Sequence, residues 1–273
     1  MQSLYICNLC KNREYQIYLK LNVCQHFSNV KYQIVKCTKC GLKSLYPIPD
    51  SDELQEIYKN YLITSSREET EAKRINIYME KLWLLKKYSN GNKLLDIGAG
   101  IGTFVYIANK QGFDAIGVEQ SKELCLTALN KYNIKLINSK FENIEFEKCL
   151  YDIVNMNHVL EHLVSPFEVL IKVHNILKPN GLLLIEVPNQ FDNIFVNIKK
   201  KLTKSIIEPS ISLHHCYFFE PRTIKKMINN AGFKIIAVRQ CSGKQNFPKI
   251  AIKKTFEFFG FGVGNFIEVL ARK

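Results

Sequence analysis

The sequence predicts an α/β fold, in which a seven-stranded sheet has helices on both faces and follows a small cysteine-rich module. Two observations predict it. Four cysteines near the N-terminus form two C-x2-C pairs, and from Lys93 onward short apolar segments alternate with amphipathic ones. Strands that alternate with helices are typical of a parallel sheet covered on both faces. The chain has 273 residues, of which 47% are hydrophobic, enough for one full-sized domain and a small appendage.

The cysteine pairs predict a metal site at the start of the chain. Their spacing allows four thiolates to close a tetrahedral zinc site, and Gly41 can take the positive φ that follows such a turn. We therefore predict a zinc-binding, zinc-ribbon-like module over residues 1–46. Its expected ligands are Cys7, Cys10, Cys37 and Cys40.

A helical segment is expected between this module and the main domain. Two prolines near Pro47 end the first module, and residues 68–88 carry apolar side chains at helical spacing. We assign residues 47–90 to a helical linker or cap and residues 91–273 to the main domain.

Seven short apolar segments of the main domain are expected to be its strands. Each is bounded by turn residues or by an amphipathic helical segment. The segments are KLLDIGA, DAIGVEQ, IKLINSK, YDIVNMN, GLLLIEVP, FKIIAVRQ and FIEVLAR.

A glycine turn after the first of these strands predicts a ligand site. In LLDIGAGIGTF, three glycines allow the backbone to approach a ligand at the carboxyl edge of the sheet. The next strand ends in Glu119, where an acid can accept hydrogen bonds from both ribose hydroxyls. Asp96 precedes the turn, and the third glycine comes one residue earlier than in G-x-G-x-x-G. These details favour S-adenosylmethionine over a dinucleotide.

From about Lys93 to its end, the chain resembles the class I S-adenosylmethionine-dependent methyltransferases of the ubiquinone-methyltransferase-like group, which have a Rossmann-like fold. The resemblance rests on LLDIGAGIG, GVEQS, YDIVNMNHVLEHL and ILKPNGLLLIEVPN. It implies that Glu119 holds the ribose, that the segment near Phe141 lies at the adenine, and that Asn157 ends its strand beside the cofactor methyl group. It also implies that the methionine part is cradled by Asp96, Gly98, Gly100 and Gly102.

The stretch HVLEH, residues 158–162, also matches the H-x-x-E-H spelling of an inverted zinc peptidase motif. We reject that interpretation because such a motif belongs in mid-helix, whereas this one follows a buried strand. The resemblance instead places His158 on the rim of the active site and implies a structural role for His162. In some ubiquinone-type relatives acids and a histidine in this region hold a divalent ion, which leaves a metal at Glu161 and His162 open.

The substrate side of the site is expected to include His215. The segment HHCYFFEPRTI resembles one in which a histidine precedes an aromatic pair and a capped helix, and His215 occupies that place. The cysteine module resembles that of sugar methyltransferases, some of which use a histidine here as a base. The sugar methyltransferases that methylate carbon often carry a further C-terminal domain. Because this sequence ends with the seventh expected strand, we favour O-methylation, or less strongly N-methylation, over C-methylation. We predict His215 as the base and His158 as a second catalytic residue.

The charge composition indicates which kinds of partner the protein favours. Lys plus Arg number 38 and Asp plus Glu 25, which gives a net charge of +13 and favours anionic partners, although a lysine-rich composition alone gives the same excess. We expect a small anionic or glycan-precursor substrate such as a nucleotide-linked sugar. The alternative is an RNA methyltransferase that uses the module as an RNA platform, which the missing N/D-P-P-Y/F spelling disfavours.

The remaining expectations concern location. The sequence contains no run of about 18 uncharged apolar residues and no secretion signal at its start, so we expect a cytoplasmic protein without a transmembrane segment.

Residues 190–214 are expected to form an insertion on the substrate side. Its mixture of lysines with Ile, Phe and Val suits a lid, a phosphate-binding helix or a peripheral membrane contact, and an ordinary solvated helix fits it equally.

Overall fold

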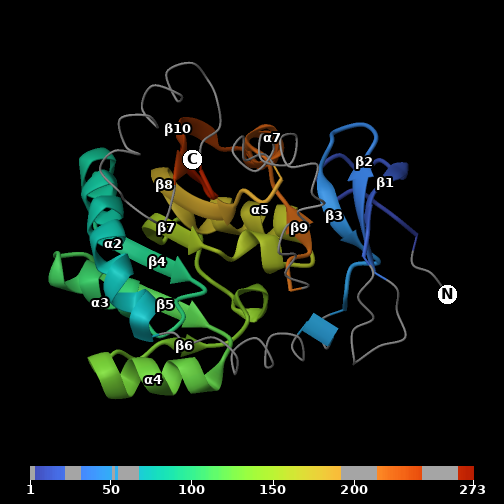
Figure 1. Cartoon of the computed structure of the whole chain (residues 1–273). Coiled ribbons are helices and arrows are strands. Elements are labelled where there is room, and N and C mark those ends of the chain that lie inside the picture. The colour runs from blue at the N-terminus through green and yellow to red at the C-terminus, as the bar shows by residue number, and fades with distance from the viewer. Residues whose placement is uncertain (1–3, 22–31, 51–52, 55–67, 192–213, 242–263) are drawn as a thin grey trace, which may run out of the picture.

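The computed structural model describes residues 4–21, 32–50, 53–54, 68–191, 214–241 and 264–273, which form two β-sheets with helices packed around the larger one (Figure 1). The substrate-side insertion falls almost entirely outside the described residues. No helix of the described part is both long enough and apolar enough to span a membrane.

The larger sheet has seven strands, one in each of the seven predicted segments. They are β4 Lys93–Ile97, β5 Asp114–Glu119, β6 Ile137–Asn138, β7 Tyr151–Asn157, β8 Leu177–Pro188, β10 Lys234–Cys241 and β11 Phe266–Arg272. Their order across the sheet is β10-β11-β8-β7-β4-β5-β6. The predicted α/β fold with a seven-stranded sheet is confirmed.

The direction of one strand differs from the expectation of a parallel sheet. β11 runs antiparallel to both of its neighbours, β8 and β10. β4 pairs in parallel with β5 on one side and with β7 on the other. The chain therefore changes direction across the sheet between β4 and β7, and a ligand of such a sheet binds outside the carboxyl ends of the strands at this point.

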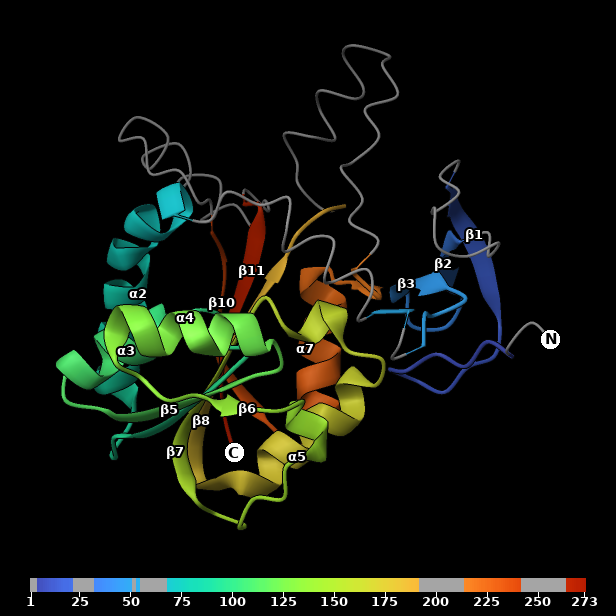
Figure 2. The ribbon, with the colours of Figure 1, turned by 90° about the horizontal axis from the view of Figure 1, so that it is seen from below.

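Helices cover both faces of this sheet. They are α2 Glu68–Tyr88, α3 Thr103–Lys110, α4 Lys122–Tyr132, α5 Pro166–Ile176 and α7 Pro221–Asn230, with short 3-10 turns η1 Phe141–Asn143 and η2 Leu160–His162. Figure 2 shows α2 and α3 on one side of the strands and α5 and α7 on the other. Helix α7 begins with Pro221 in its first turn, where the missing N–H of proline costs no hydrogen bond.

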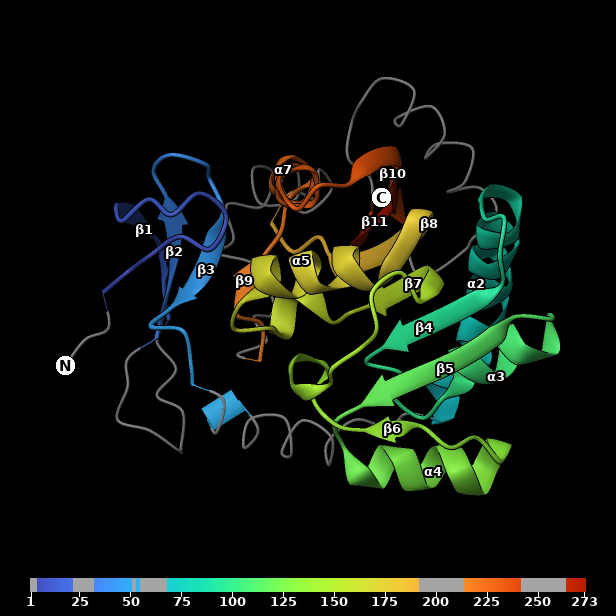
Figure 3. The same ribbon diagram turned by 180° about the vertical axis from the view of Figure 1, so that it is seen from behind.

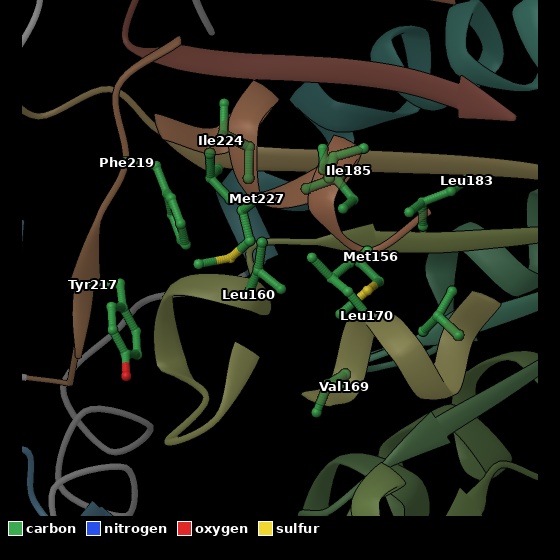
Figure 4. Close-up of a cluster of buried hydrophobic side chains, with 14 of the residues drawn as sticks. Met156, Leu160, Val169, Leu170, Leu183, Ile185, Tyr217, Phe219, Ile224 and Met227 are labelled. Carbon is green, nitrogen blue, oxygen red and sulfur yellow. The ribbon is translucent and has the colours of Figure 1, made fainter. Parts of the chain in front are cut away.

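The core follows the two-residue period of the strands. Leu94 and Leu184 belong to the cluster that includes Leu82 of α2 and Phe104 of α3. Their neighbours in the chain point the opposite way and join the side chains of α5 and α7, where Ile185 lies among Leu170, Ile224 and Met227 (Figure 4). Because successive side chains of a strand face opposite sides, each apolar run serves both layers.

The smaller sheet contains a strand from the main domain. β1 Tyr15–Lys20, β2 Gln33–Cys37 and β3 Lys43–Tyr46 form an antiparallel meander, and β9 Tyr217–Phe218 pairs with β3 (Figure 3). The buried Lys43 of β3 forms an ion pair with Glu220, just beyond β9. The cysteine-bearing segment is thus joined by backbone hydrogen bonds to the chain that follows His215.

Candidate active site

The glycine turn between β4 and α3 has the backbone that the sequence predicts. Gly98, Gly100 and Gly102 have φ of 73°, 58° and 76°, values that residues with a side chain rarely adopt. A Cβ at Gly98 would come within 2.4 Å of Val159, and one at Gly102 within 3.1 Å of Ala128. A Cβ at Gly100 would meet nothing within 4 Å, so only this glycine borders open space.

Glu119 lies directly against this turn. Its Oε2 accepts a hydrogen bond from the Gly100 amide and its Oε1 one from the Ser121 amide, both at 2.9 Å. A carboxylate offers about four acceptor positions, so these two bonds leave capacity for hydroxyl donors. The carboxylate both braces the turn and presents a negative charge beside the open space at Gly100.

Asp96 is buried at the end of β4. Its Oδ1 accepts a 2.7 Å hydrogen bond from Asn155 of β7. Burial raises the pKa of Asp96 to about 7, against the smaller opposing effects of the Asn155 hydrogen bond and the Lys81 charge. A cationic group bound nearby would favour the ionised form.

Lys81 of α2 is the buried cation of the site, with only 1% of its surface exposed. Its Nζ donates to Oδ1 of Asn157 at 2.8 Å and lies 3.0 Å from Glu186 and 3.7 Å from Glu268. No role was predicted for Lys81 from the sequence. Its spacing does indicate burial, because Lys81 lies on the helix face of Tyr78 and Leu85, three and four residues away, where a surface lysine is out of place.

His158 follows β7 and has a φ of 55°. Its Nδ1 lies 3.4 Å from Glu161 and its Nε2 3.1 Å from Glu186. Burial acts to lower the pKa of His158, but the hydrogen bonds and charges of the two carboxylates outweigh it and raise the pKa to about 9. The ring is therefore protonated at neutral pH.

His215 meets two other histidines. His162 lies in η2, and His214 and His215 directly precede β9; the three side chains have ligand nitrogens within 4.8 Å of one another. Burial and the neighbouring His162 lower the pKa of His215 to about 4, so its imidazole is neutral at pH 7. No local pattern indicated this convergence, since some 50 residues separate His162 from the pair.

The segment at Phe141 lies next to Glu119 in space. Asn138 donates hydrogen bonds to the carbonyls of Glu119 and Gln120, both at 3.0 Å. The Phe141 ring itself is buried and stacks on Phe146. An adenine placed here would therefore contact the backbone around residue 140 more than the face of this ring.

The four cysteines of the N-terminal module converge. The Sγ atoms of Cys7 and Cys40 are 3.5 Å apart, and those of Cys10 and Cys37 are 3.6 Å apart. All four sulfur atoms lie within 4.8 Å of one another. After each C-x2-C pair the chain turns through a positive φ, at Gly41 (79°) as predicted and at Lys11 (57°) where no glycine indicated it. Four thiol groups in this arrangement could hold a metal ion.

The sequence of this chain is similar to those of known proteins. A family model described as "Methyltransferase domain" matches residues 71–238. An uncharacterized protein of Methanocaldococcus jannaschii is 27% identical over 72% of this chain and 90% of its own length. The ubiquinone biosynthesis O-methyltransferase of Rickettsia canadensis is 26% identical over 59% and 71%, and the C-methyltransferase NovU of Streptomyces niveus is 25% identical over 59% and 41%.

Solved structures agree on the fold. A crystal structure of an S-adenosylmethionine-dependent methyltransferase from Thermotoga maritima, titled a possible histamine N-methyltransferase, superposes with a TM-score of 0.56. It covers 80% of this chain and 99% of its own, at 18% identity. The chain belongs to the methyltransferase domain family and is a class I enzyme whose methyl donor is S-adenosylmethionine.

Proposed function

We propose that this enzyme transfers a methyl group to an oxygen of a small anionic or glycan-precursor acceptor, such as a nucleotide-linked sugar. The observation that carries the proposal is a group of histidines near the end of β7 and the start of β9: His158 lies between the Glu161 and Glu186 carboxylates, and His162, His214 and His215 converge. An oxygen acceptor must lose a proton as it bonds to carbon, and a neutral imidazole can receive it. The net charge of +13 supports an anionic acceptor.

Each residue at the glycine turn has a proposed role toward the donor. S-adenosylmethionine supplies an electrophilic methyl group when bound. Gly100 would allow its methionine part to approach the backbone, Asp96 would attract the cationic ammonium, and Glu119 would accept hydrogen bonds from the ribose hydroxyls. Asn157, fixed by Lys81, would border the methyl group.

The substrate side is proposed to act through two histidines. His215 would relieve the acceptor of its proton, and His158, cationic between its two carboxylates, would orient a negatively charged part of the acceptor. A base is most effective when its pKa lies near the working pH, so His215 with a pKa of about 4 would be a weak base unaided. Some further group that lowers the pKa of the acceptor would therefore help it.

We also propose that Cys7, Cys10, Cys37 and Cys40 hold a structural zinc ion. Zinc–sulfur bonds of 2.3 Å place tetrahedral sulfur atoms about 3.8 Å apart. The sulfur separations of 3.5 and 3.6 Å in two of the pairs support this donor set. The role would be structural, because four protein ligands leave no position for a substrate.

The donor site is tested by calorimetry with S-adenosylhomocysteine. Glu119→Ala removes a charged acceptor of two hydrogen bonds worth about 1.5–3 kcal/mol each, so affinity should fall at least tenfold. Glu123→Ala, which removes an exposed acid in the next helix, is the matched control and should bind as the wild type does. Equal affinity of Glu119→Ala and wild type would remove Glu119 from the donor site.

The acceptor class is tested by transfer of a labelled methyl group. Nucleotide-linked sugars, neutral sugars and total RNA are each incubated with the enzyme and labelled S-adenosylmethionine. Label in a nucleotide-linked sugar, joined through oxygen, is expected. Label in RNA alone would overturn the proposed acceptor and favour the RNA-modifying alternative.

A further inference from the structure

Three imidazole rings form one cluster on the substrate side of the site. The ring centroids of His162 and His214 are 5.0 Å apart, those of His162 and His215 4.8 Å, and those of His214 and His215 4.6 Å. His214 and His215 are both largely buried. Imidazole nitrogens gathered in this way could bind a common metal ion.

Backbone and side-chain contacts fix the tautomers of two of these rings. Nδ1 of His162 lies 2.9 Å from the carbonyl oxygen of His214, and Nδ1 of His215 lies 3.2 Å from Oε1 of Gln190. Because these oxygens only accept, each Nδ1 carries the proton and each Nε2 carries a lone pair. Histidines that bind metals almost always donate their other N–H to a carbonyl or carboxylate in this way.

Glu161 adds a buried negative charge to the cluster. Its side chain is 1% exposed, and among the described residues neither carboxylate oxygen has a partner at hydrogen-bond geometry. Its Oε1 lies 3.7 Å from Nε2 of His162 and forms a 3.4 Å ion pair with Nδ1 of His158. The protonated His158 offsets part of the cost of burying this carboxylate, and a metal ion on the side of His162 would offset more of it.

The chain also holds this cluster in place from the outside. The Cys216 amide donates to the Glu161 carbonyl at 2.8 Å, and Tyr217 Oη donates to the Val164 carbonyl at 2.9 Å. These bonds hold η2 beside the segment that leads into β9, so they limit how far His162 can move from His214 and His215, which lie in the turn before β9.

We infer that His162, His214 and His215 bind a first-row divalent transition metal ion, with the Glu161 carboxylate beside it. Imidazole nitrogens suit zinc, iron and nickel, whereas magnesium and calcium prefer oxygen ligands. Zinc–nitrogen bonds of about 2.0–2.1 Å place donors about 3.4 Å apart, so the three rings would move inward on binding. Three protein ligands leave a position open, as in catalytic sites.

The open position gives the ion a role, and this part of the inference rests on the proposed function. An acceptor hydroxyl bound there would have a lowered pKa, because a divalent ion stabilises the deprotonated oxygen, and its proton would pass to solvent water before the oxygen attacks the methyl group. His215 would then act on the acceptor as a ligand of the ion in place of a free base.

The ion site is tested by titrating the full-length, zinc-containing protein with Co²⁺. We expect one equivalent to bind with visible d–d absorption and without the thiolate charge-transfer bands that binding at the cysteines would give. His214→Gln and His215→Gln should bind Co²⁺ at least tenfold more weakly, and His174→Gln, a histidine of α5 outside the cluster, should bind it as the wild type does. Wild-type protein that binds Co²⁺ only with thiolate bands, or not at all, would overturn the site, as would full binding by both cluster variants.

A second measurement needs no variant. Anomalous diffraction at the cobalt edge from wild-type crystals should show a peak between the three imidazole rings, and a peak at the cysteines alone would refute the site. The outcomes separate the two proposals. Protein that binds S-adenosylhomocysteine and methylates a sugar without binding Co²⁺ refutes the ion site only, whereas Co²⁺ binding by a protein that methylates no oxygen acceptor refutes the proposed function only.

Discussion

Lys81 is a buried cation whose removal should destabilise the enzyme. It contacts Glu186 at 3.0 Å, Glu268 at 3.7 Å and Asn157 at 2.8 Å with 1% of its surface exposed. Breaking a buried pair by removing one partner costs about 3–5 kcal/mol, because the remaining charge is buried without compensation. Two contacts moderate this cost, since Glu186 keeps His158 at 3.1 Å and Glu268 keeps its pair with Arg239.

We therefore expect Lys81→Met to lower the free energy of unfolding by about 3 kcal/mol, the low end of that range. For a domain of about 200 residues this corresponds to a fall in Tm of about 6–12 °C. Urea unfolding and thermal melting followed by circular dichroism measure both quantities. Lys87→Met is the matched control: it lies on the same helix, has an exposed side chain next to Trp83, and should change stability by less than about 1 kcal/mol.

A double variant separates charge from packing. Glu186→Gln removes the buried carboxylate charge that Lys81→Met leaves without its lysine partner. The double variant Lys81→Met with Glu186→Gln should therefore be more stable than the sum of the two single effects predicts. A loss below about 1 kcal/mol in Lys81→Met, or strict additivity in the double variant, would refute the argument that the buried pair stabilises this site.

Three further predictions concern metal, pH and catalysis. The protein should retain about one zinc ion through dialysis against a weak chelator, and Cys37→Ser should abolish that zinc by elemental analysis and destabilise the fold, because metal binding and folding of the module are coupled. Affinity for S-adenosylhomocysteine, which carries the same ammonium group, should fall about tenfold from pH 8 to pH 6, because Asp96 with a pKa of about 7 loses its charge as pH falls, and Asp96→Asn should abolish this dependence. With the acceptor known, His215→Ala should lower turnover by about 10²–10⁴ with nearly unchanged donor binding, and His158→Ala should cost less.

Each of these has a contrary outcome. Zinc-free protein prepared with metal available would count against the cysteine site. A pH dependence that persists in Asp96→Asn would assign the titration to another group. A larger loss of turnover in His158→Ala than in His215→Ala would transfer the proton-accepting role to His158.

The main sheet could be predicted because its strands are buried on both faces. Segments such as GLLLIEVP are apolar over their whole length, and β8 is buried over most of it. The glycine turn and Glu119 could also be predicted, since a turn with several positive φ values strongly favours glycine. The two roles of Glu119 could not, because its bond to the Gly100 amide exists only once β4 and β5 lie side by side.

The smaller sheet and the histidine cluster were beyond the sequence for a physical reason. β1 is half exposed and β9 has two residues, so neither has a run long enough to show a period. β9 forms because β3 offers it an edge, and that contact joins residues about 170 positions apart. The same long-range contact brings His214 and His215 to His162, which no local pattern encodes. Glu161 and His162 lie in a separate 3-10 turn, and α5 starts only at Pro166.

The most direct test of the donor site at the glycine turn is a crystal structure of the protein with S-adenosylhomocysteine. The ligand should lie at the carboxyl edge of β4 and β5, with its ribose hydroxyls within about 3 Å of the Glu119 carboxylate and its amino group facing Asp96. Its methionine part should lie in the open space beside Gly100. Ligand density elsewhere on the protein, or ribose hydroxyls that do not contact Glu119, would refute this donor site.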